Sequence, residues 1–354
     1  MRGDDIGLLG ATGAVGVAAA QRLAGLGSAL RLGGRDLRRA TGVAHALPGP
    51  ATAARVDLTD EASLAAFCRG CRVVVNCAGP SYRVLDRVAR AALLAGADYV
   101  DAAGDAPVGR LLAADPPAGE QSVVLSAGAS PGLTGLLPRL LTTDGPLRHL
   151  DVFAGGPARS THVAAVDTLL TRGREFGLPG AEWRDGRIRE GALPGLDAVT
   201  LPGFPGPVTA RPFLSVESQR LARSADVDRL RAYTVFAGER IPDLLAQAWA
   251  DGRPVEEYAA ALAAAADEEV AEHGQGFTLL AAARRPPGRP GPVRVLLTSP
   301  DPSALSGAVV ALTVRAVLAG GAPPGVRHAA DVLDPHACLT ALRADPAVSL
   351  LELD

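Results

Sequence analysis

The feature that most constrains the fold is a glycine-rich turn close to the N-terminus. The apolar segment Asp5–Leu9 precedes a helix-forming stretch, Ala14–Ala24, and the glycines Gly10, Gly13 and Gly16 mark the passage between them. In such a turn the glycines permit a tight bend, a close backbone approach to a pyrophosphate, and tight packing of helix on strand. The first-turn amides of the helix then face the phosphates. The strand, turn and helix predict dinucleotide binding; the alternative is a glycine turn in an α/β domain without a ligand.

Short apolar segments alternate with helical stretches over the first 145 residues. The predicted strands are Asp5–Leu9, Ala29–Leu32, Ala53–Val56, Val73–Asn76, Tyr99–Asp101 and Ser122–Leu125. The predicted helices are Ala14–Ala24, Ala62–Cys68, Val84–Ala95 and Gly132–Leu141. Continuous apolar strands that alternate with helices indicate a parallel sheet covered on both faces. The pattern therefore predicts a Rossmann-type, doubly wound α/β domain.

A different pattern begins near His149. The predicted strands are His149–Ala154, Phe213–Glu217, Ala232–Phe236, Phe277–Ala283 and Val293–Thr298, and the predicted helices are Thr161–Phe176, Ile241–Ala250 and Val255–Glu272. Several strands alternate in polarity, which indicates a second, α+β domain with a mixed or antiparallel sheet. We predict a first domain of residues 1–145, to which about 303–345 return through the apolar helix Leu305–Ala319, and a second domain of residues 146–302.

Composition excludes several classes of protein. The net charge of −3 provides no basic surface for nucleic acid. No apolar run of about 18 residues predicts a membrane span, and the N-terminus lacks a signal-peptide pattern. We therefore expect a cytoplasmic protein, of bacterial origin by its Ala, Gly, Arg and Pro richness. We also expect a homodimer, because the exposed edge of the second sheet needs to be covered.

The end of the second predicted strand indicates the type of dinucleotide. A carboxylate there would bind the ribose 2′-hydroxyl of NAD, but the chain has Arg35, with Arg38 and Arg39 close behind. A guanidinium can bind a 2′-phosphate through two hydrogen bonds, so we expect NADP(H). Asp36 argues against this interpretation, and Arg38 and Arg39 are equally well explained as solvated helix charges. Asp57, after the third strand, is expected to order the loop beside the adenine.

Three further motifs follow in order. They are Asn76-Cys77-Ala78-Gly79-Pro80, Ala95-Gly96-Ala97-Asp98-Tyr99-Val100-Asp101, and Gly128-Ala129-Ser130-Pro131-Gly132. This succession resembles the saccharopine dehydrogenase-like NAD(P)-dependent reductases, whose order is N-x-A-G-P, A-G-x-x-Y-x-D and G-x-x-P-G. The resemblance covers the first 140 residues well and the remainder only in outline. The segment Trp183–Arg187 resembles the R-D-G-R turn of bacterial members.

The resemblance implies hydride transfer between NAD(P) and a C–N bond, and for some relatives reduction of C=C bonds of lipids. It implies that Asn76–Pro80 flank the nicotinamide ribose, and that Ser126–Gly132 form both a hinge between the domains and a wall of the nicotinamide site. With the glycine turn, the expected cofactor-binding residues are Gly10, Thr12, Gly13, Ala14, Val15, Gly16, Arg35, Arg38, Asp57, Asn76, Ala78, Gly79, Pro80, Ala127 and Gly128.

A reductase of this kind also needs a proton donor. Asp105 and Tyr82 follow strands that end at the expected cleft, and His162 lies near the start of the second domain. Each residue also has a structural interpretation. Asp105, like Asp101, could cap the following loop, Tyr82 could be a packing residue, and His162 could be an exposed residue at a helix start.

The cysteines and histidines predict no metal site. Cys68 and Cys71 form a C-x-x-C pair at a helix end, without a helix N-terminus that would activate a thiol and without a second ligand pair.

Three functions fit this sequence. The first is an NADPH-dependent reductase of a C=N bond in a small or carrier-bound metabolite, as in amino-acid-derived or secondary metabolism. The second is a C=C reductase of a lipid or polyketide, for which the Pro/Gly-rich loop Leu193–Val208 would form one wall of a groove. The third is a non-catalytic NADP sensor that recruits a partner.

Overall fold

The computed structural model of the protein describes residues 4–116 and 119–354 and divides into two compact units. Unit 1 comprises Met1–Leu133 and Ser303–Asp334, and unit 2 comprises Thr134–Pro302 and Pro335–Asp354. Residues 134–145 and 335–345, which the sequence placed in the first domain, therefore belong to unit 2. The reason is local packing: the 3₁₀ helix Leu137–Leu141 and helix α14, Pro335–Arg343, contact each other and strands of the second sheet.

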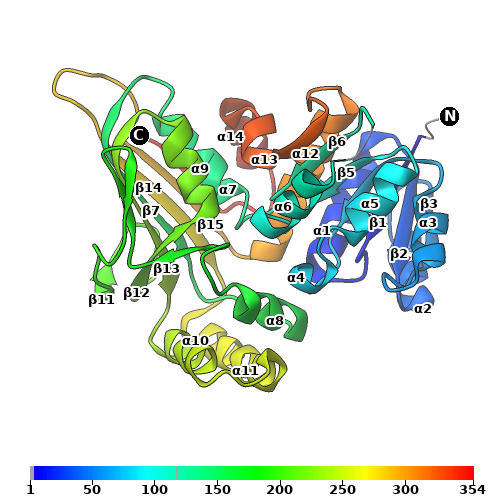
Figure 1. Ribbon diagram of the computed structural model, residues 1–354, viewed down its shortest axis with the longest axis horizontal. Helices are drawn as coiled ribbons and strands as arrows, with labels where there is room; N and C mark the ends of the chain where they lie inside the picture. Colours follow the sequence, from blue (N-terminus) through cyan, green and yellow to red (C-terminus); the bar gives the residue numbers. More distant parts are fainter. Residues whose placement is uncertain (1–3, 117–118) are drawn as a thin grey trace. The chain divides into compact units, whose positions relative to one another are not determined.

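Unit 1 contains the predicted doubly wound parallel sheet (Figure 1). Within the described residues its order is β16-β6-β5-β4-β1-β2-β3, and every pairing is parallel. The strands are β1 Asp5–Leu9, β2 Leu30–Gly34, β3 Ala51–Arg55, β4 Cys71–Asn76, β5 Asp98–Asp101, β6 Ser122–Leu125 and β16 Gly325–His328. The helices are α1 Ala14–Leu23, α2 Leu37–His45, α3 Glu61–Cys68, α4 Ser81–Val84, α5 Arg87–Leu94, α6 Ala106–Ala114, α12 Pro302–Leu318 and α13 Ala329–Val332.

Both faces of this sheet are covered by helices, which explains its continuous apolar strands. On one face, side chains of α3, α5 and α6 pack against Leu9, Val74 and Tyr99. On the other face α12 lies so close to α1 that a Cβ on Gly307 would come within 2.7 Å of Ala18. The single helix predicted for Val84–Ala95 is wrong: α4 and α5 are separate, because Leu85 has a left-handed φ of 52° between them.

Unit 2 is α+β with a mixed sheet, as predicted. Within the described residues the central order is β10-β9-β13-β7-β14-β15-β17, β13 pairs parallel with β7, and the other neighbours are antiparallel. The strands are β7 Leu147–Gly155, β8 Gly177–Pro179, β9 Glu182–Arg184, β10 Arg187–Arg189, β11 Leu196–Thr200, β12 Pro207–Ser215, β13 Val227–Phe236, β14 Phe277–Arg284, β15 Arg294–Ser299 and β17 Leu350–Leu353. The longer helices are α8 His162–Leu170, α9 Val216–Ser224, α10 Arg240–Asp251 and α11 Val255–His273.

Two local features of unit 2 have simple causes. The predicted strand Phe213–Glu217 ends early, because the Ser215 hydroxyl accepts a hydrogen bond from the Ser218 amide and caps α9. The segment Trp183–Arg187 contains the two-residue turn between β9 and β10, in which Asp185 and Gly186 have φ values of 48° and 75°. Positive φ at both central residues is typical of a type I′ hairpin turn.

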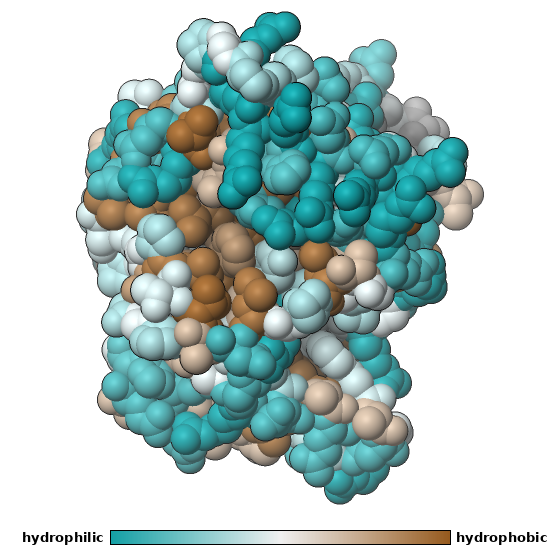
Figure 2. Space-filling model, turned by 90° about the vertical axis from the view of Figure 1, so that its left-hand side faces the viewer, coloured by the Kyte–Doolittle hydropathy of each residue, from teal (hydrophilic) through white to brown (hydrophobic). Residues whose placement is uncertain are grey.

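One face of the second sheet carries an apolar cluster. Phe204, Tyr233, Val235, Leu280 and Leu296 pack there with residues of the loop around β11. Figure 2 shows apolar side chains in a hollow surrounded by hydrophilic surface, on the side of the molecule where β11, β12 and β13 lie in Figure 1. In the part of the chain that the structure describes, no helix is both long and apolar enough to span a bilayer.

Candidate dinucleotide and catalytic site

The glycine turn after β1 forms a cradle without side chains. Gly10 has a φ of 72°, and a Cβ there would lie 2.5 Å from the Ala78 amide nitrogen. A Cβ on Gly16 would overlap the Gly10 carbonyl oxygen. Gly13 is the N-cap of α1 and has no side-chain cap, and Gly13 and Ala14 are exposed. The helix amides at this end are thus accessible, which fits a bound pyrophosphate.

The expected 2′-phosphate site lies after β2. Arg35 and Arg38 are exposed, as is Asp36. Asp36 is the N-cap of α2, where its carboxylate accepts a hydrogen bond from the Arg39 amide at 3.1 Å. This role explains the acidic residue without a ribose contact. The Arg39 guanidinium reaches back to the Thr12 carbonyl at 3.5 Å and lines a cavity of about 370 Å³ between α1 and α2. Arg39 therefore joins Arg35 as a candidate for phosphate binding.

Asp57 orders the loop after β3. Its carboxylate accepts hydrogen bonds from the amide and the hydroxyl of Thr59, at 2.9 and 2.7 Å. These bonds, with smaller contributions from the charges of Arg35 and Arg55, lower the pKa of Asp57. Arg35 and Asp57 follow the ends of β2 and β3, which are neighbouring parallel strands.

A buried hydrogen-bond network holds the ends of β4 and β5 together. Asn76 donates to Asp101 at 3.2 Å and accepts from the Ala78 amide at 3.1 Å. Asp101 also accepts from the Tyr99 hydroxyl at 2.5 Å and from the amides of Ala103 and Gly104 at 3.0 and 2.8 Å. Burial and the Asp101 charge raise the pKa of Tyr99 well above its usual value. Asp101 is thus a structural carboxylate, and the network fixes the backbone of Asn76–Pro80.

The turn after β6 is equally restricted. A Cβ on Gly128 would lie 2.6 Å from the Ala102 carbonyl oxygen, and Gly132 has a φ of 134°. Ala127 is buried and its amide donates to the Asp101 carbonyl at 2.9 Å. The turn therefore follows the end of β5 closely.

Three polar side chains meet where β6 and β16 end. The Ser126 hydroxyl lies 3.0 Å from Nδ1 of His328 and 3.4 Å from Oδ1 of Asp105. Nδ1 of His328 lies 3.7 Å from the same carboxylate oxygen. Ser126 is fully buried, with a left-handed φ of 57°. We name Asp105, Ser126 and His328 the β6–β16 cluster.

The structure places the other two catalytic candidates separately. Tyr82 is half-buried on α4 in unit 1. His162 is the exposed first residue of α8 in unit 2, after the N-cap Thr161. Sequence reasoning did not select His328, which lies 202 residues from Ser126 and carries no local motif.

The cysteine pair is buried on the α3 side of the sheet. Burial raises the pKa of the Cys68 thiol to about 12 and also raises the pKa of Cys71. Neither thiol is therefore a nucleophile near neutral pH. Among the described residues no group of three or more His, Cys, Asp or Glu side chains is arranged to hold a metal.

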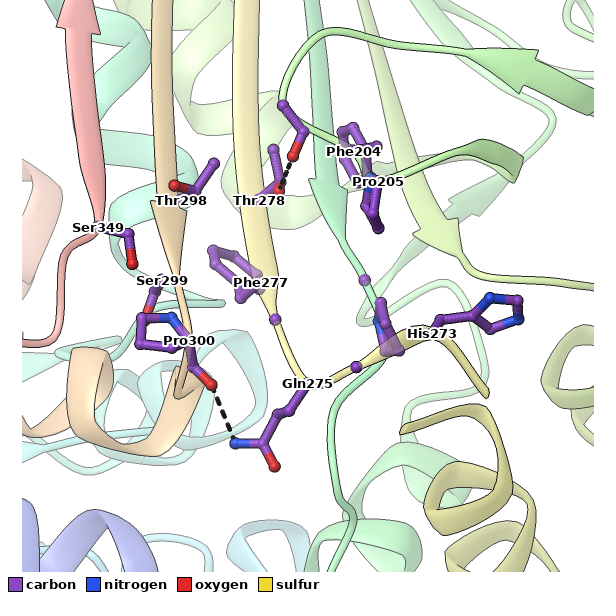
Figure 3. A pocket seen from close by; sticks show the side chains of 15 residues that line it. Phe204, Pro205, His273, Gln275, Phe277, Thr278, Thr298, Ser299, Pro300 and Ser349 are labelled. Atoms are coloured by element: carbon purple, nitrogen blue, oxygen red, sulfur yellow. Dashed lines mark hydrogen bonds between the residues drawn. The ribbon is translucent and has the colours of Figure 1, made fainter. Parts of the chain in front are cut away.

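Unit 2 has a cavity of its own, of about 270 Å³, at one end of its sheet (Figure 3). Phe204 and Pro205 form one wall, while Thr298 and Ser349 lie across from them on the far side of Phe277. Among the described residues that line it there is no Lys, Arg, Asp or Glu, and His273 is the one ionisable side chain. Thr278 donates to the Gly203 carbonyl at 2.9 Å, and Gln275 donates to the Pro300 carbonyl at 3.1 Å. The cavity suits an uncharged group.

Comparisons with known proteins agree with this geometry. Residues 6–123 match the family described as saccharopine dehydrogenase NADP binding domain. Among solved structures, apo histidine-tagged saccharopine dehydrogenase (L-Glu forming) from Saccharomyces cerevisiae is 15% identical with a TM-score of 0.68, over 99% of each chain. This likeness shows the fold of both units. A search of curated proteins gave no match.

Two partial structural matches carry no argument about the fold. A putative uncharacterized protein from Mycobacterium paratuberculosis is 25% identical over 21% of this chain and 29% of its own, with a TM-score of 0.19. A putative exported protein from Burkholderia pseudomallei is 28% identical over 29% and 48%, with a TM-score of 0.23. The glycine cradle and the match of residues 6–123 to the saccharopine dehydrogenase NADP binding domain support an NADP-dependent oxidoreductase with NADP(H) as its cofactor.

Proposed function

We propose that this protein is an NADPH-dependent reductase of C=N bonds in a small or carrier-bound metabolite. The observation that carries the proposal is the combination of a saccharopine dehydrogenase NADP-binding domain with a second unit of the saccharopine dehydrogenase fold. The family relationship favours chemistry at a C–N bond. Bound NADPH supplies the hydride, and the chain supplies the cradle, the 2′-phosphate contacts and a proton donor.

The acceptor that we propose has an uncharged part. The cavity in unit 2 combines aromatic and proline walls with hydroxyl groups, and none of its described lining residues is an arginine or a lysine. A substrate carboxylate would normally require an arginine or lysine partner when it is removed from water. The cavity therefore favours a neutral side chain or carrier arm over an amino-acid carboxylate.

The test is oxidation of NADPH, followed at 340 nm, with cyclic imines and with amine–carbonyl pairs that form open imines. The matched control is Gly16→Ala, which disrupts the dinucleotide cradle. Any NADPH oxidation that remains in this variant measures the activity of contaminating reductases. We expect turnover of at least one imine by the wild type and none by the variant. NADPH binding without turnover of any imine contradicts the proposal.

One observation favours a second candidate, a C=C reductase of a lipid or polyketide. Gly203, Phe204 and Pro205, which lie between β11 and β12 in the segment Leu193–Val208, line the cavity in unit 2 and give it an apolar wall. Enoyl thioesters belong in the same assay. Oxidation of NADPH by enoyl thioesters alone would establish this alternative, whereas binding without turnover of either class would favour the non-catalytic sensor.

A further inference from the structure

We propose that His328 is the proton donor of the reductase and that Asp105 and Ser126 are its positioning residues. The inference rests on the proposed function for the identity of the acceptor. It rests on the β6–β16 cluster for the geometry, since all three residues belong to unit 1. It changes the role of Asp105, which the sequence had offered as the donor itself.

The cluster determines which ring nitrogen of His328 exchanges its proton. The Ser126 hydroxyl has one proton, and the Gly104 carbonyl at 3.1 Å and the Asp105 carboxylate at 3.4 Å can only accept it. Ser126 Oγ therefore presents a lone pair to Nδ1 of His328 at 3.0 Å. The Asp105 oxygen 3.7 Å from Nδ1 also favours a proton on that nitrogen. Nδ1 stays protonated, and Nε2 gains and loses the proton.

This arrangement differs from a hydrolytic triad. In a triad the base uses one ring nitrogen toward the nucleophile and the other toward the carboxylate. Here Ser126 and Asp105 both lie beside Nδ1, so Ser126 is not activated through the ring. Its burial and left-handed φ make it a fixed support, of a kind that strained backbone at functional sites often provides.

The position of His328 along the sheet edge supports the role. The expected adenosine contacts, Arg35 and Asp57, follow β2 and β3, and the expected pyrophosphate contact, the Gly10 turn, follows β1. The nicotinamide half is therefore expected over the other side of the edge, where β4, β5 and β6 end. His328 ends the next strand, β16, and its side chain is 16% exposed against 10% for Asp105. It is the more accessible of the two ionisable members.

Charged side chains of both signs lie on the elements around the imidazole. Asp105 is the carboxylate in the cluster. Asp101 on β5 is hydrogen-bonded to Asn76 and Tyr99. Other charged side chains on adjoining elements are exposed: Arg110 on α6, Arg327 on β16 and Asp331 on α13. Arg327 donates to the Val326 carbonyl on its own strand.

The protein's part in the reaction is one proton transfer. The acceptor carbon gains the hydride while the imine nitrogen forms a new N–H bond with the Nε2 proton of His328. The Nε2–H bond breaks, and the imidazolium becomes neutral imidazole with its Nδ1–H still directed to Ser126. Solvent then reprotonates Nε2, so each turnover consumes one hydride and one proton.

The first experiment needs no substrate. Long-range ¹H–¹⁵N spectra of the ¹⁵N-histidine-labelled protein, without cofactor and above the titration range of histidine, report the neutral tautomer, and His328→Gln assigns the signal. We expect the Nδ1–H tautomer for His328 in the wild type and a shift toward the Nε2–H tautomer in Ser126→Ala. An Nε2–H tautomer in the wild type would overturn the inference even if imines are reduced.

The second experiment uses whichever imine the wild type reduces. We expect His328→Gln to lower kcat by about 100-fold or more, with the dissociation constant of NADPH within about twofold. Added imidazole should partly restore His328→Ala. Ser126→Ala and Asp105→Asn should move the pH profile of kcat, which a merely structural role would not do. The matched control is His45→Gln on the exposed part of α2.

The outcomes separate the two proposals. Failure of the wild type on all imines contradicts the proposed function, while the tautomer still decides the geometry of the cluster. Turnover by the wild type together with an unchanged kcat and pH profile in His328→Gln contradicts the role of His328 alone.

Discussion

The two sides of one sheet edge in unit 1 differ in how their polar groups are held. On the β1–β3 side, the cradle is backbone, and Arg35 and Asp57 are exposed. On the β4–β16 side, Asn76, Asp101 and Asp105 are buried, with exposed fractions of 1%, 1% and 7%. Exposed charges retain their water until a ligand displaces it, whereas buried carboxylates depend on partners within the protein. The first side is therefore built for recognition, and the second for fixed geometry.

The cradle gives the largest expected effect on the recognition side. Gly16→Ala forces the Gly10 carbonyl and the start of α1 apart. We expect the affinity for NADPH and for NADH to fall equally, by about 100-fold or more, because displacement of a positioned group by about 1 Å has effects of that size. Isothermal titration calorimetry measures both.

The matched control is Gly25→Ala, where an added Cβ meets nothing within 4 Å. Full affinity in Gly16→Ala would show that the turn does not hold the pyrophosphate.

Asp101 tests the opposite side. Asp101→Asn replaces an acceptor with a donor that faces Asn76 and Tyr99. We expect the free energy of unfolding to fall by about 3 kcal/mol, because a buried donor left without an acceptor costs about 1–3 kcal/mol. Urea denaturation followed by circular dichroism measures the change. Asp4→Asn, at an exposed position, should leave stability within about 0.5 kcal/mol, and an equal effect at both positions would contradict the structural role of Asp101.

The contrast also explains what the sequence could predict. The cradle is local, so Gly10, Gly13 and Gly16 indicate it within a few residues of chain. The parallel arrangement of β1, β2, β4, β5 and β6 was predicted from apolar segments that alternate with helices. The fold class and the NADP(H) cofactor were accordingly predicted correctly.

The β6–β16 cluster could not be found in this way. Its histidine arrives on a strand that pairs with β6 only after the chain has passed through unit 2. No periodicity links residues so far apart. The sequence did not predict the break between α4 and α5, because a single residue with a left-handed φ, Leu85, interrupts a pattern that is otherwise helical. The predicted domain limits differ from those of the two units because the 3₁₀ helix Leu137–Leu141 and α14 pack against strands of the second sheet.

Arg35 gives an intermediate effect and tests the direction of cofactor preference. A charge-assisted hydrogen bond contributes about 1.5–3 kcal/mol, so Arg35→Ala should weaken NADPH binding by about 10- to 100-fold and leave NADH within about twofold. Calorimetric titration with both dinucleotides checks this. Arg39→Ala should have a smaller effect of the same sign, and Arg38→Ala the smallest, because Arg39 reaches back to Thr12. An equal loss of affinity for both dinucleotides in Arg35→Ala would contradict a contact between Arg35 and the 2′-phosphate.

Tyr99 gives the smallest expected effect and tests burial on the β4–β16 side through alkaline pH. The pKa of Tyr99 is raised in the folded protein, mainly by burial and by Asp101, whereas an unfolded tyrosine ionises near about pH 10. Above that pH the unfolded state releases a proton that the folded state keeps. The free energy of unfolding should therefore fall as pH rises, by up to about 1.4 kcal/mol per pH unit from this residue.

Tyr99→Phe removes that contribution, so the free energy of unfolding of the variant should decline less steeply above pH 10. Near neutral pH the variant should be less stable by about 1 kcal/mol, because the hydrogen bond to Asp101 is lost. Tyr233 and Tyr258, whose pKa values are also raised, remain in both proteins and cancel in the difference. Urea denaturation from pH 7 to pH 11 measures both slopes. Equal slopes of stability against pH in the two proteins would mean that Tyr99 ionises in the folded protein as readily as in the unfolded chain. That result would contradict the burial of polar groups on the β4–β16 side.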